Sequence, residues 1–323
     1  MTSENLHLQT KDSIPFSCHL CPWQCGVDRQ TRLGVCGVPS TYLIARAAPH
    51  YDEEPIISGS QGAGNIFFAG CTLRCLFCQN AKISQERFGF ILSEDELIST
   101  MLRLQDQGVE NIGLVTADHY LHRLPATLRK AKAQGLTLPI ALNTSSYLCV
   151  SSLRALEGLI DVYIPDLKYV SDALANKYSR APHYFSYAHL AIEEMFRQVG
   201  TPILTPDGLL ARGLLVRHLA LPGCGEDSKA VISYLGEHFG TDIYFSLMSQ
   251  YFPTYQALSC PALNRRLSQE EYDILLDACD AAGLDRGFRQ DLGNEDESQY
   301  VPNFDGTGLP AGCQPYQGLK AEL

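Results

Sequence analysis

The chain has 323 residues, 45% hydrophobic and 19% charged, which is an ordinary globular composition for one large domain with small additions. Its net charge of −11 argues against a surface that follows nucleic-acid phosphates, so we expect no nucleic-acid partner. Residues 1–13 are polar, and no apolar run reaches the roughly 18 residues of a membrane span. This predicts a cytoplasmic protein with neither a secretory signal nor a membrane partner.

Three regions differ in composition. Residues 1–58 are rich in Cys, Pro and polar residues and show little periodicity, which is typical of a small metal-binding module. Residues 59–250 alternate short apolar runs with amphipathic stretches. Residues 251–323 contain a helical pattern at Ser268–Ala282 and then a tail rich in Gly, Pro, Asn and Asp. We expect this tail to wrap around the surface of a central catalytic domain.

The middle region predicts an α/β fold. The expected strands are Asn65–Ala69, Ile112–Thr116, Leu138–Asn143, Asp161–Leu167, Leu214–Leu219 and Asp242–Leu247. Helical patterns at 93–108, 122–135 and 227–240 lie between them, and each ends in glycine. Strands followed by helices imply right-handed βαβ units and a parallel sheet. Since about six units are too few for an eight-stranded barrel, we expect an open partial (β/α)6 TIM-like barrel.

A three-cysteine loop follows the first expected strand. Cys71, Cys75 and Cys78 have the spacing C-x3-C-x2-C, and the aromatic Phe77 precedes the last cysteine. Three thiolates on a [4Fe–4S] cluster leave one iron with an open coordination position. The amino and carboxylate groups of S-adenosylmethionine can occupy that position. One electron from the reduced cluster then breaks the sulfonium C–S bond and gives methionine and a 5′-deoxyadenosyl radical. A zinc knuckle would need a fourth ligand.

Several segments of the sequence, including the three-cysteine loop, resemble those of a known family. The chain resembles the radical SAM superfamily, specifically the PflX-type group similar to pyruvate formate-lyase activating enzyme. The resemblance covers nearly the whole chain and includes residues 50–80, NTSSY (143–147), DVYIPDLKY (161–169) and VRHLALPG (216–223). It implies a partial barrel of the radical SAM type, with a flavodoxin or ferredoxin as electron donor and a glycyl radical protein as one candidate substrate.

Polar residues at the ends of the expected strands are the candidate cofactor contacts, because ligands bind at the carboxyl ends of parallel strands. With Phe77, this set consists of Asn80, Thr116, His119, Asn143, Thr144, Asp166, Lys168 and His218. The resemblance implies that Lys168 reaches the carboxylate of S-adenosylmethionine and that His218 lies near its ribose. The chain departs from activating enzymes in having Asn143 in place of Asp, and it lacks their Gly-Gly-Glu at residues 114–120.

A second cysteine group lies nearer the N-terminus. Cys18, Cys21, Cys25 and Cys36 supply four thiols within a short, glycine-containing segment. Four soft ligands suit either tetrahedral zinc or a fully ligated auxiliary Fe–S cluster. The irregular spacing does not choose between the two, and free or redox-active thiols are a third alternative.

Several functions agree with this sequence. The first is a radical SAM enzyme that activates a glycyl radical enzyme, and the second is a radical SAM enzyme that modifies a small molecule or a peptide. A remote alternative is a non-catalytic Fe–S or zinc interaction protein. The carboxylate run at 52–54 predicts a solvated loop or an ion-pair lid over the barrel.

Overall fold

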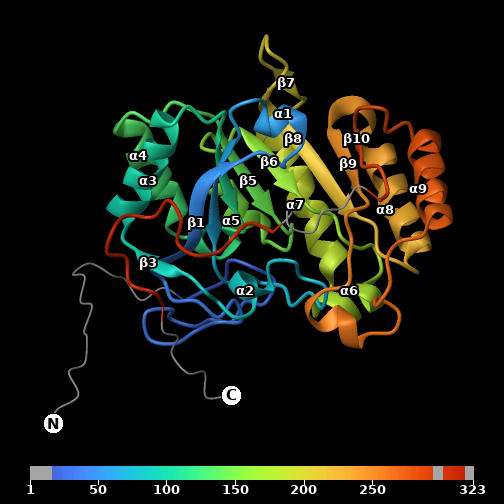
Figure 1. The fold of residues 1–323 in the computed structure, drawn as a ribbon, viewed down its shortest axis with the longest axis horizontal. Helices are drawn as coiled ribbons and strands as arrows, with labels where there is room; N and C mark the ends of the chain where they lie inside the picture. Colours follow the sequence, from blue (N-terminus) through green and yellow to red (C-terminus); the bar gives the residue numbers. More distant parts are fainter. Residues whose placement is uncertain (1–16, 294–300, 317–323) are drawn as a thin grey trace.

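The computed structural model describes residues 17–293 and 301–316 (Figure 1). The polar segment 1–13, from which we expect no secretory signal, lies outside the described residues. One open sheet dominates the fold, with the strand order β10-β9-β8-β6-β5-β4-β2-β1-β3, and β7 pairs with β8 beside this path. Such an open sheet of βα units confirms the expected α/β partial barrel.

Parallel pairing runs from β2 to β10 across the sheet, and β1 and β3 extend one edge with antiparallel pairing. The strands are β1 (Tyr42–His50), β2 (Ala63–Phe68), β3 (Phe90–Leu92), β4 (Ile112–Val115), β5 (Ile140–Thr144), β6 (Val162–Pro165), β7 (Ile203–Leu204), β8 (Leu210–Leu219), β9 (Tyr244–Met248) and β10 (Gly287–Arg289). All six expected strands are therefore present, as β2, β4, β5, β6, β8 and β9, with ends shifted by a few residues.

Helices connect the parallel strands. The α-helices are α1 (Pro55–Ser58), α2 (Ala81–Ser84), α3 (Glu94–Asp106), α4 (Leu124–Ala133), α5 (Val150–Arg154), α6 (Asp172–Ser179), α7 (Tyr184–Val199), α8 (Gly225–His238) and α9 (Gln269–Ala281). Short 3₁₀ helices lie at η1 (Asp118–Tyr120), η2 (Gly240–Asp242) and η3 (Tyr255–Ser259). Capping boxes of Ser93 with Glu96 and of Ser268 with Glu271 begin α3 and α9, which explains why the sequence located both starts closely.

The strand β1 is the main element that the sequence did not predict. It lies within residues 1–58, where we expected little regular structure, and it pairs with β2 along most of its length. Most of its residues are buried on both faces, so the alternation that signals a half-exposed strand is missing. The C-terminal tail crosses β1, where Gly306 N donates to Ala45 O and Ala47 N donates to Thr307 O. The tail thus covers the antiparallel edge, as Figure 1 shows in red beside β1.

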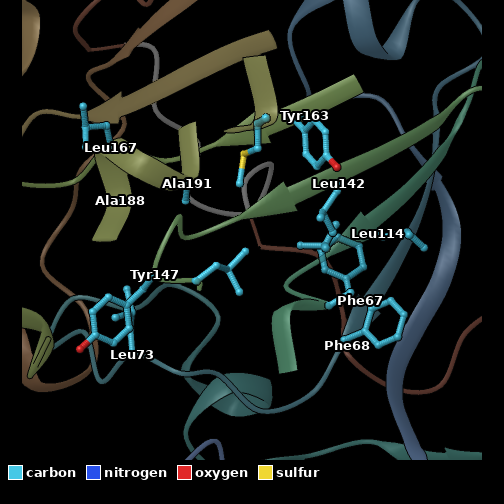
Figure 2. Close-up of a cluster of buried hydrophobic side chains, with 14 of the residues drawn as sticks. Phe67, Phe68, Leu73, Leu114, Leu142, Tyr147, Tyr163, Leu167, Ala188 and Ala191 are labelled. Atoms are coloured by element: carbon cyan, nitrogen blue, oxygen red, sulfur yellow. The ribbon is translucent and has the colours of Figure 1, made fainter. Parts of the chain in front are cut away.

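The hydrophobic core lies between the sheet and its helices. Leu114, Leu142 and Tyr163 project from neighbouring strands and gather with Ala188 and Ala191 of α7 (Figure 2). All five are fully or almost fully buried, so this packing fixes the strands that carry the site residues at their ends. Across the described ranges, none of the helices has the length and hydrophobicity needed to cross a membrane.

The carboxyl ends of the parallel strands meet at one rim of the sheet. In Figure 1, α2 and the blue loops of residues 17–41 lie on the lower side, whereas α1 and β7 lie on the upper side. Since α2 follows β2 through the loop of Cys71, this lower side is the rim to which the parallel strands point. The two cysteine groups therefore share one end of the molecule.

Candidate active site

A sharp turn at Gly70 leads from β2 into the three-cysteine loop. Gly70 has a φ of 87°, a conformation that L side chains rarely adopt. A Cβ at this position would lie 2.5 Å from Val38 Cγ1 and 3.0 Å from the carbonyl oxygen of Cys36. The turn therefore requires glycine both for its backbone conformation and for the close approach of the N-terminal segment.

The three thiols of the loop line a single cavity of about 220 Å³. Burial raises the pKa of Cys71, Cys75 and Cys78, to about 11 for Cys78, and the charge of Cys75 raises the pKa of the other two further. All three are free thiols. Burial and mutual repulsion make the three thiolates unfavourable on their own. A bound cation would compensate their negative charge and take the place of the three thiol protons, so the thiols suit metal binding.

Two serine hydroxyls contact these sulfurs. Ser179 Oγ lies 3.1 Å from Cys75 Sγ, and Ser84 Oγ lies 3.1 Å from Cys78 Sγ. Ser179 is also 2.8 Å from the hydroxyl of Tyr169, which fixes its orientation. Hydrogen bonds to cysteine sulfur tune the reduction potential of a bound cluster, so these serines form the surroundings of the ligand set.

An ion pair follows β6 at the wall of the same cavity. Lys168 Nζ lies 2.6 Å from Asp166 Oδ2, and both side chains are about one-fifth exposed. Burial alone would lower the pKa of Lys168, but the charges of Asp166 and Cys75 outweigh it and raise that pKa. Tyr184 Oη donates to the carbonyl of Asp166 and accepts from the amide of Lys168, which holds this segment in place. The site thus keeps a fixed ammonium beside the thiols.

The structure brings most of the predicted cofactor contacts together. Besides the ion pair, the predicted residues that line the thiol cavity are Phe77, Asn80, Thr116 and Asn143. Thr116 has a φ of 60°, a strained value for a β-branched residue at the end of a strand. Asn80 Oδ1 is buried and has no hydrogen-bond partner among the described residues. An unsatisfied buried acceptor facing a cavity indicates a missing donor from a ligand.

Three predicted contacts lie outside the residues that line this cavity. His119 is buried and its Nε2 lies 2.9 Å from the carbonyl oxygen of Ala69, so its ring packs behind the loop. His218 is held by the carbonyl of Leu167 at 2.7 Å and by Ser228 Oγ at 2.9 Å. Burial lowers the pKa of His218 to about 4, so its ring is neutral.

The third of these is Thr144, whose Oγ1 accepts a hydrogen bond from the amide of Ser146. The side chains of His119, Thr144 and His218 are thus used in internal hydrogen bonds, and their contact with the cofactor stays a prediction.

Sequence reasoning missed Asp118, which is fully buried behind the rim. Its Oδ2 accepts from the hydroxyl of Ser145 at 3.2 Å, and Thr144 also bonds to this carboxyl. Burial raises the pKa of Asp118 to about 6 in spite of these hydrogen bonds. This carboxyl positions the loop after β5.

A second, deeper cavity of about 340 Å³ adjoins the first, and the two share wall residues that include Asn80, Asn143 and Arg217. Glu53 and Glu54 come from the turn before α1, and both are paired with the guanidinium of Arg217 on β8. Asn65 Nδ2 also donates to Glu53 Oε1 at 2.6 Å. Glu53 and Glu54 thus form a largely buried ion-pair wall of this cavity, whereas Asp52 is exposed, so the solvated loop that was one of the two expectations applies only to Asp52.

The charges of this wall do not balance. Burial alone would raise the pKa of Glu53, but Arg217, His50 and the hydrogen bond from Asn65 lower it, so the carboxylate stays ionised. Two carboxylates face one guanidinium, and Asp52 lines the same cavity. Arg289 also lines it, but its guanidinium is paired with Asp280 at 2.6 Å. The deeper cavity is therefore polar and has a surplus of negative charge.

Comparison with known proteins agrees with this geometry. Residues 65–208 match the profile of the family described as the Radical SAM superfamily. The matched segment begins in β2, includes the three-cysteine loop and Lys168, and ends just before β8. Over this segment the chain is similar to the radical SAM superfamily. This family uses a [4Fe–4S] cluster and S-adenosylmethionine.

One curated relative is similar over most of this chain. It is an uncharacterized protein of Methanocaldococcus jannaschii, 26% identical over 295 residues, which cover 87% of this chain and 79% of the relative. The name of this relative assigns no reaction and therefore indicates no substrate.

Solved structures resemble the chain more distantly. A domain of pyruvate-formate lyase-activating enzyme from Bacteroides vulgatus is 13% identical, with 53% of this chain and 92% of that one covered and a TM-score of 0.37. The hydrogenase maturase HydG from Carboxydothermus hydrogenoformans is 16% identical, with 73% and 56% covered and a TM-score of 0.48. SuiB from Streptococcus suis, bound to S-adenosylmethionine, is 11% identical, with 71% and 52% covered and a TM-score of 0.46. The chain thus spans little more than half of HydG and SuiB.

The residues present fit the cofactors of the radical SAM family. Three free thiols converge on one cavity, which suits a cluster that keeps one iron open. The ammonium of Lys168 and the unsatisfied Asn80 Oδ1 lie on the same wall and complement a carboxylate and an amino group. The cluster would be held by Cys71, Cys75 and Cys78. The wall of Glu53, Glu54 and Arg217 would bound the adjoining second cavity.

The other four cysteines gather beside this loop. Cys18, Cys21 and Cys36 are buried and Cys25 is partly exposed, and all four are free. Burial raises the pKa of Cys21 to about 12, and the neighbouring thiols add to the effect. Within residues 17–293 and 301–316, no three His, Cys, Asp or Glu side chains form the compact geometry of a single-ion site, in this group or in the three-cysteine loop.

Proposed function

We propose that this chain cleaves S-adenosylmethionine reductively and that the resulting 5′-deoxyadenosyl radical abstracts a hydrogen atom from a substrate. The observation that carries the proposal is the shared cavity of Cys71, Cys75 and Cys78 with the ion pair of Asp166 and Lys168. One electron and the sulfonium give methionine and the radical, and hydrogen transfer gives 5′-deoxyadenosine and a substrate radical. When bound, the [4Fe–4S] cluster supplies that electron.

The residues of the cavity orient the cofactor and exclude water. Lys168 offers a charge-assisted hydrogen bond to the carboxylate of S-adenosylmethionine, and Asp166 keeps the ammonium charged and aimed. Asn143 and Thr116 offer neutral hydrogen-bonding groups at neighbouring strand ends. Phe77 packs edge-on against Tyr251 and closes the apolar side of the loop.

The lining of the deeper cavity favours a small polar molecule or a peptide segment as the substrate. Its wall of Glu53, Glu54 and Arg217 carries excess negative charge, which suits a substrate with an amine, a guanidinium or several N–H donors. Activation of a glycyl radical enzyme is the other candidate, and it rests on the family resemblance. The electron donor we propose is a flavodoxin or ferredoxin. We retain the cytoplasm as the compartment, because twelve free thiols need a reducing environment.

One experiment tests the reaction directly. Anaerobically purified protein with reconstituted iron and sulfide is incubated with dithionite and S-adenosylmethionine, and 5′-deoxyadenosine is measured by liquid chromatography. We expect product from the native chain and none from the Cys71→Ala variant. Native protein that makes no more product than this variant would contradict the proposal.

A second measurement separates the two substrate classes. A small-molecule filtrate and the protein fraction of a cell extract are each added to the reaction. Stimulation of 5′-deoxyadenosine formation by the filtrate favours a small substrate. A glycyl radical signal on an added protein, seen by electron paramagnetic resonance, favours the activating-enzyme alternative.

A further inference from the structure

The deeper cavity lies on the inner face of the parallel sheet. In the strand register, Ser246 of β9 is paired with Arg217 of β8 and with Phe288 of β10. Paired residues of parallel strands point to the same face of a sheet, and all three line the cavity. One layer closer to the amino ends of the strands, Leu215 packs with Ile57 of α1 in a buried apolar cluster. Packed side chains therefore close the cavity at the end opposite the rim, where Figure 1 shows α1.

The hydroxyl of Ser246 is a buried polar group without a protein partner. Ser246 is 1% exposed, and within the described residues its hydroxyl makes no hydrogen bond. Its neighbour in register, Arg217, is by contrast bonded to Glu53 and Glu54. Buried hydroxyls are nearly always satisfied, so one that faces a polar cavity points to a polar atom of a bound molecule.

Negative charge predominates in this cavity. Asp52, Glu53 and Glu54 line it, and the guanidinium of Arg217 compensates only one of these three charges. Asp52 lies at the exposed edge and has neither an ion pair nor a hydrogen bond in the part of the chain that the structure describes. Arg289, the other cation of the wall, is neutralised by an ion pair of its own. Because low-dielectric walls strengthen such a field, the cavity attracts a cation.

Apolar side chains connect this charged part with the thiol cavity. Phe67 and Phe288 line the deeper cavity, and Val115 and Met248 line both cavities. The ring of Phe288 is stacked on the ring of Tyr244, with centroids 6.2 Å apart, which holds it in place. Sites that combine apolar side chains with a few polar groups bind ligands that have hydrocarbon parts. A hydrocarbon chain can thus run from the carboxylates to the three cysteines.

We propose that the deeper cavity binds a small molecule whose hydrocarbon chain ends in an ammonium or guanidinium group. The cationic group lies among Asp52, Glu53 and Glu54, where the carboxylates complement its charge. The hydroxyl of Ser246 accepts a hydrogen bond from one of its N–H groups, and the chain extends along the apolar side chains to the thiol cavity. There one C–H bond of the chain breaks homolytically, so that the hydrogen atom joins the 5′-deoxyadenosyl radical and one unpaired electron stays on the carbon. This last step rests on the proposed function, whereas the binding of the cation does not.

The preference for a cation is tested by calorimetry on the reconstituted protein before reduction. The probes are butylguanidinium and butylammonium, with butylurea as the neutral isostere and butyrate as the anion. We expect the two cations to bind about tenfold more tightly than butylurea, and butyrate not to bind. Equal or tighter binding of butylurea or butyrate, or no binding of either cation, would overturn the proposal. A peptide such as acetyl-Gly-Arg-Gly-amide that binds about tenfold more tightly than butylguanidinium would also overturn it, because the occupant would then be a peptide.

Variants test whether the cation occupies this cavity. Asp52→Asn removes the exposed carboxylate and should weaken the binding of both cations about threefold, with the affinity for butylurea unchanged. Ser246→Ala should weaken it about fivefold, because one hydrogen bond is lost. Asp207→Asn is the matched control, since Asp207 is also exposed but lies outside both cavities. Cation binding that is unchanged in Asp52→Asn and Ser246→Ala, or equally weakened in the control, would place the cation elsewhere and overturn the proposal.

The proposed function and this binding site can fail separately. Formation of 5′-deoxyadenosine is measured in the same preparation, with the Cys71→Ala variant as its blank. Product formation without a preference for the cations would refute the binding site and leave the proposed function intact. Tight binding of the cations without product would refute the proposed function and leave the binding site intact.

Discussion

Arg217→Met tests the buried ion-pair wall of the deeper cavity. The side chains of Arg217, Glu53 and Glu54 are only 9%, 11% and 9% exposed. Methionine keeps an apolar stem of similar length but leaves two carboxylates buried without their counter-charge. Breaking a buried pair in this way costs about 3–5 kcal/mol of unfolding free energy, most of it the desolvation of the remaining charge.

The pH dependence of this loss has a definite sign. In the native chain the pKa of Glu53 is lowered, so its ionised form adds stability above its ordinary pKa of 4.5, and that stability is lost as the pH falls through the lowered value. Without Arg217, burial remains as the largest influence and raises the pKa of Glu53. The loss of unfolding free energy in the variant then becomes smaller as the pH falls through the raised pKa of Glu53, because protonation removes the buried charge. We expect a larger deficit at pH 7.5 than at pH 5.5.

The assay is urea unfolding followed by circular dichroism at both pH values. The matched control is Arg289→Met, which breaks the more exposed pair with Asp280 and should cost no more than about 1 kcal/mol. The reasoning is refuted if Arg217→Met is as stable as the native chain, or if its deficit is the same at the two pH values.

Three further predictions concern the rim. Lys168→Met should weaken the binding of S-adenosylmethionine by about 10- to 150-fold, because it removes a charge-assisted hydrogen bond of about 1.5–3 kcal/mol. Calorimetry on the reconstituted protein measures this affinity, and an unchanged affinity would contradict the role of Lys168. Gly70→Ala should lower the melting temperature more than Gly108→Ala, because both have positive φ but a Cβ meets neighbours only at residue 70. Asp118→Asn should gain stability relative to the native chain by about 2.4 kcal/mol from pH 4 to pH 7, since burial raises the pKa of this carboxyl from 3.8 to about 6 and its ionisation destabilises the fold. A pH-independent difference in chemical denaturation would argue against that burial effect.

Local features of the sequence were sufficient to predict the three-cysteine loop and the parallel strands. Cysteines three and four residues apart are held close by the backbone itself, so the spacing of Cys71, Cys75 and Cys78 already predicts a shared ligand set. Apolar runs between capped helices likewise predict parallel strands, and the carboxyl ends of such strands meet at one rim. Lys168 and Asn143 could be placed at the cavity for that reason.

Other features depended on contacts between distant segments. The position of a residue at a strand end does not say whether its side chain faces the cavity or the packing behind it, so the internal hydrogen bonds of His119 and His218 could not be predicted. The strand β1 was missed because both of its faces are covered, which removes the periodic signal.

The sequence by itself determined that this chain has a three-thiolate loop at the end of a parallel strand, because that chemistry is encoded within a few consecutive residues. Only the tertiary structure decided what surrounds the loop. Glu53 and Glu54 meet an arginine more than 160 residues away, and the four-cysteine segment packs on the catalytic turn at Gly70. Such pairings arise from the packing of distant segments and the burial of charge, which no local pattern of residues specifies.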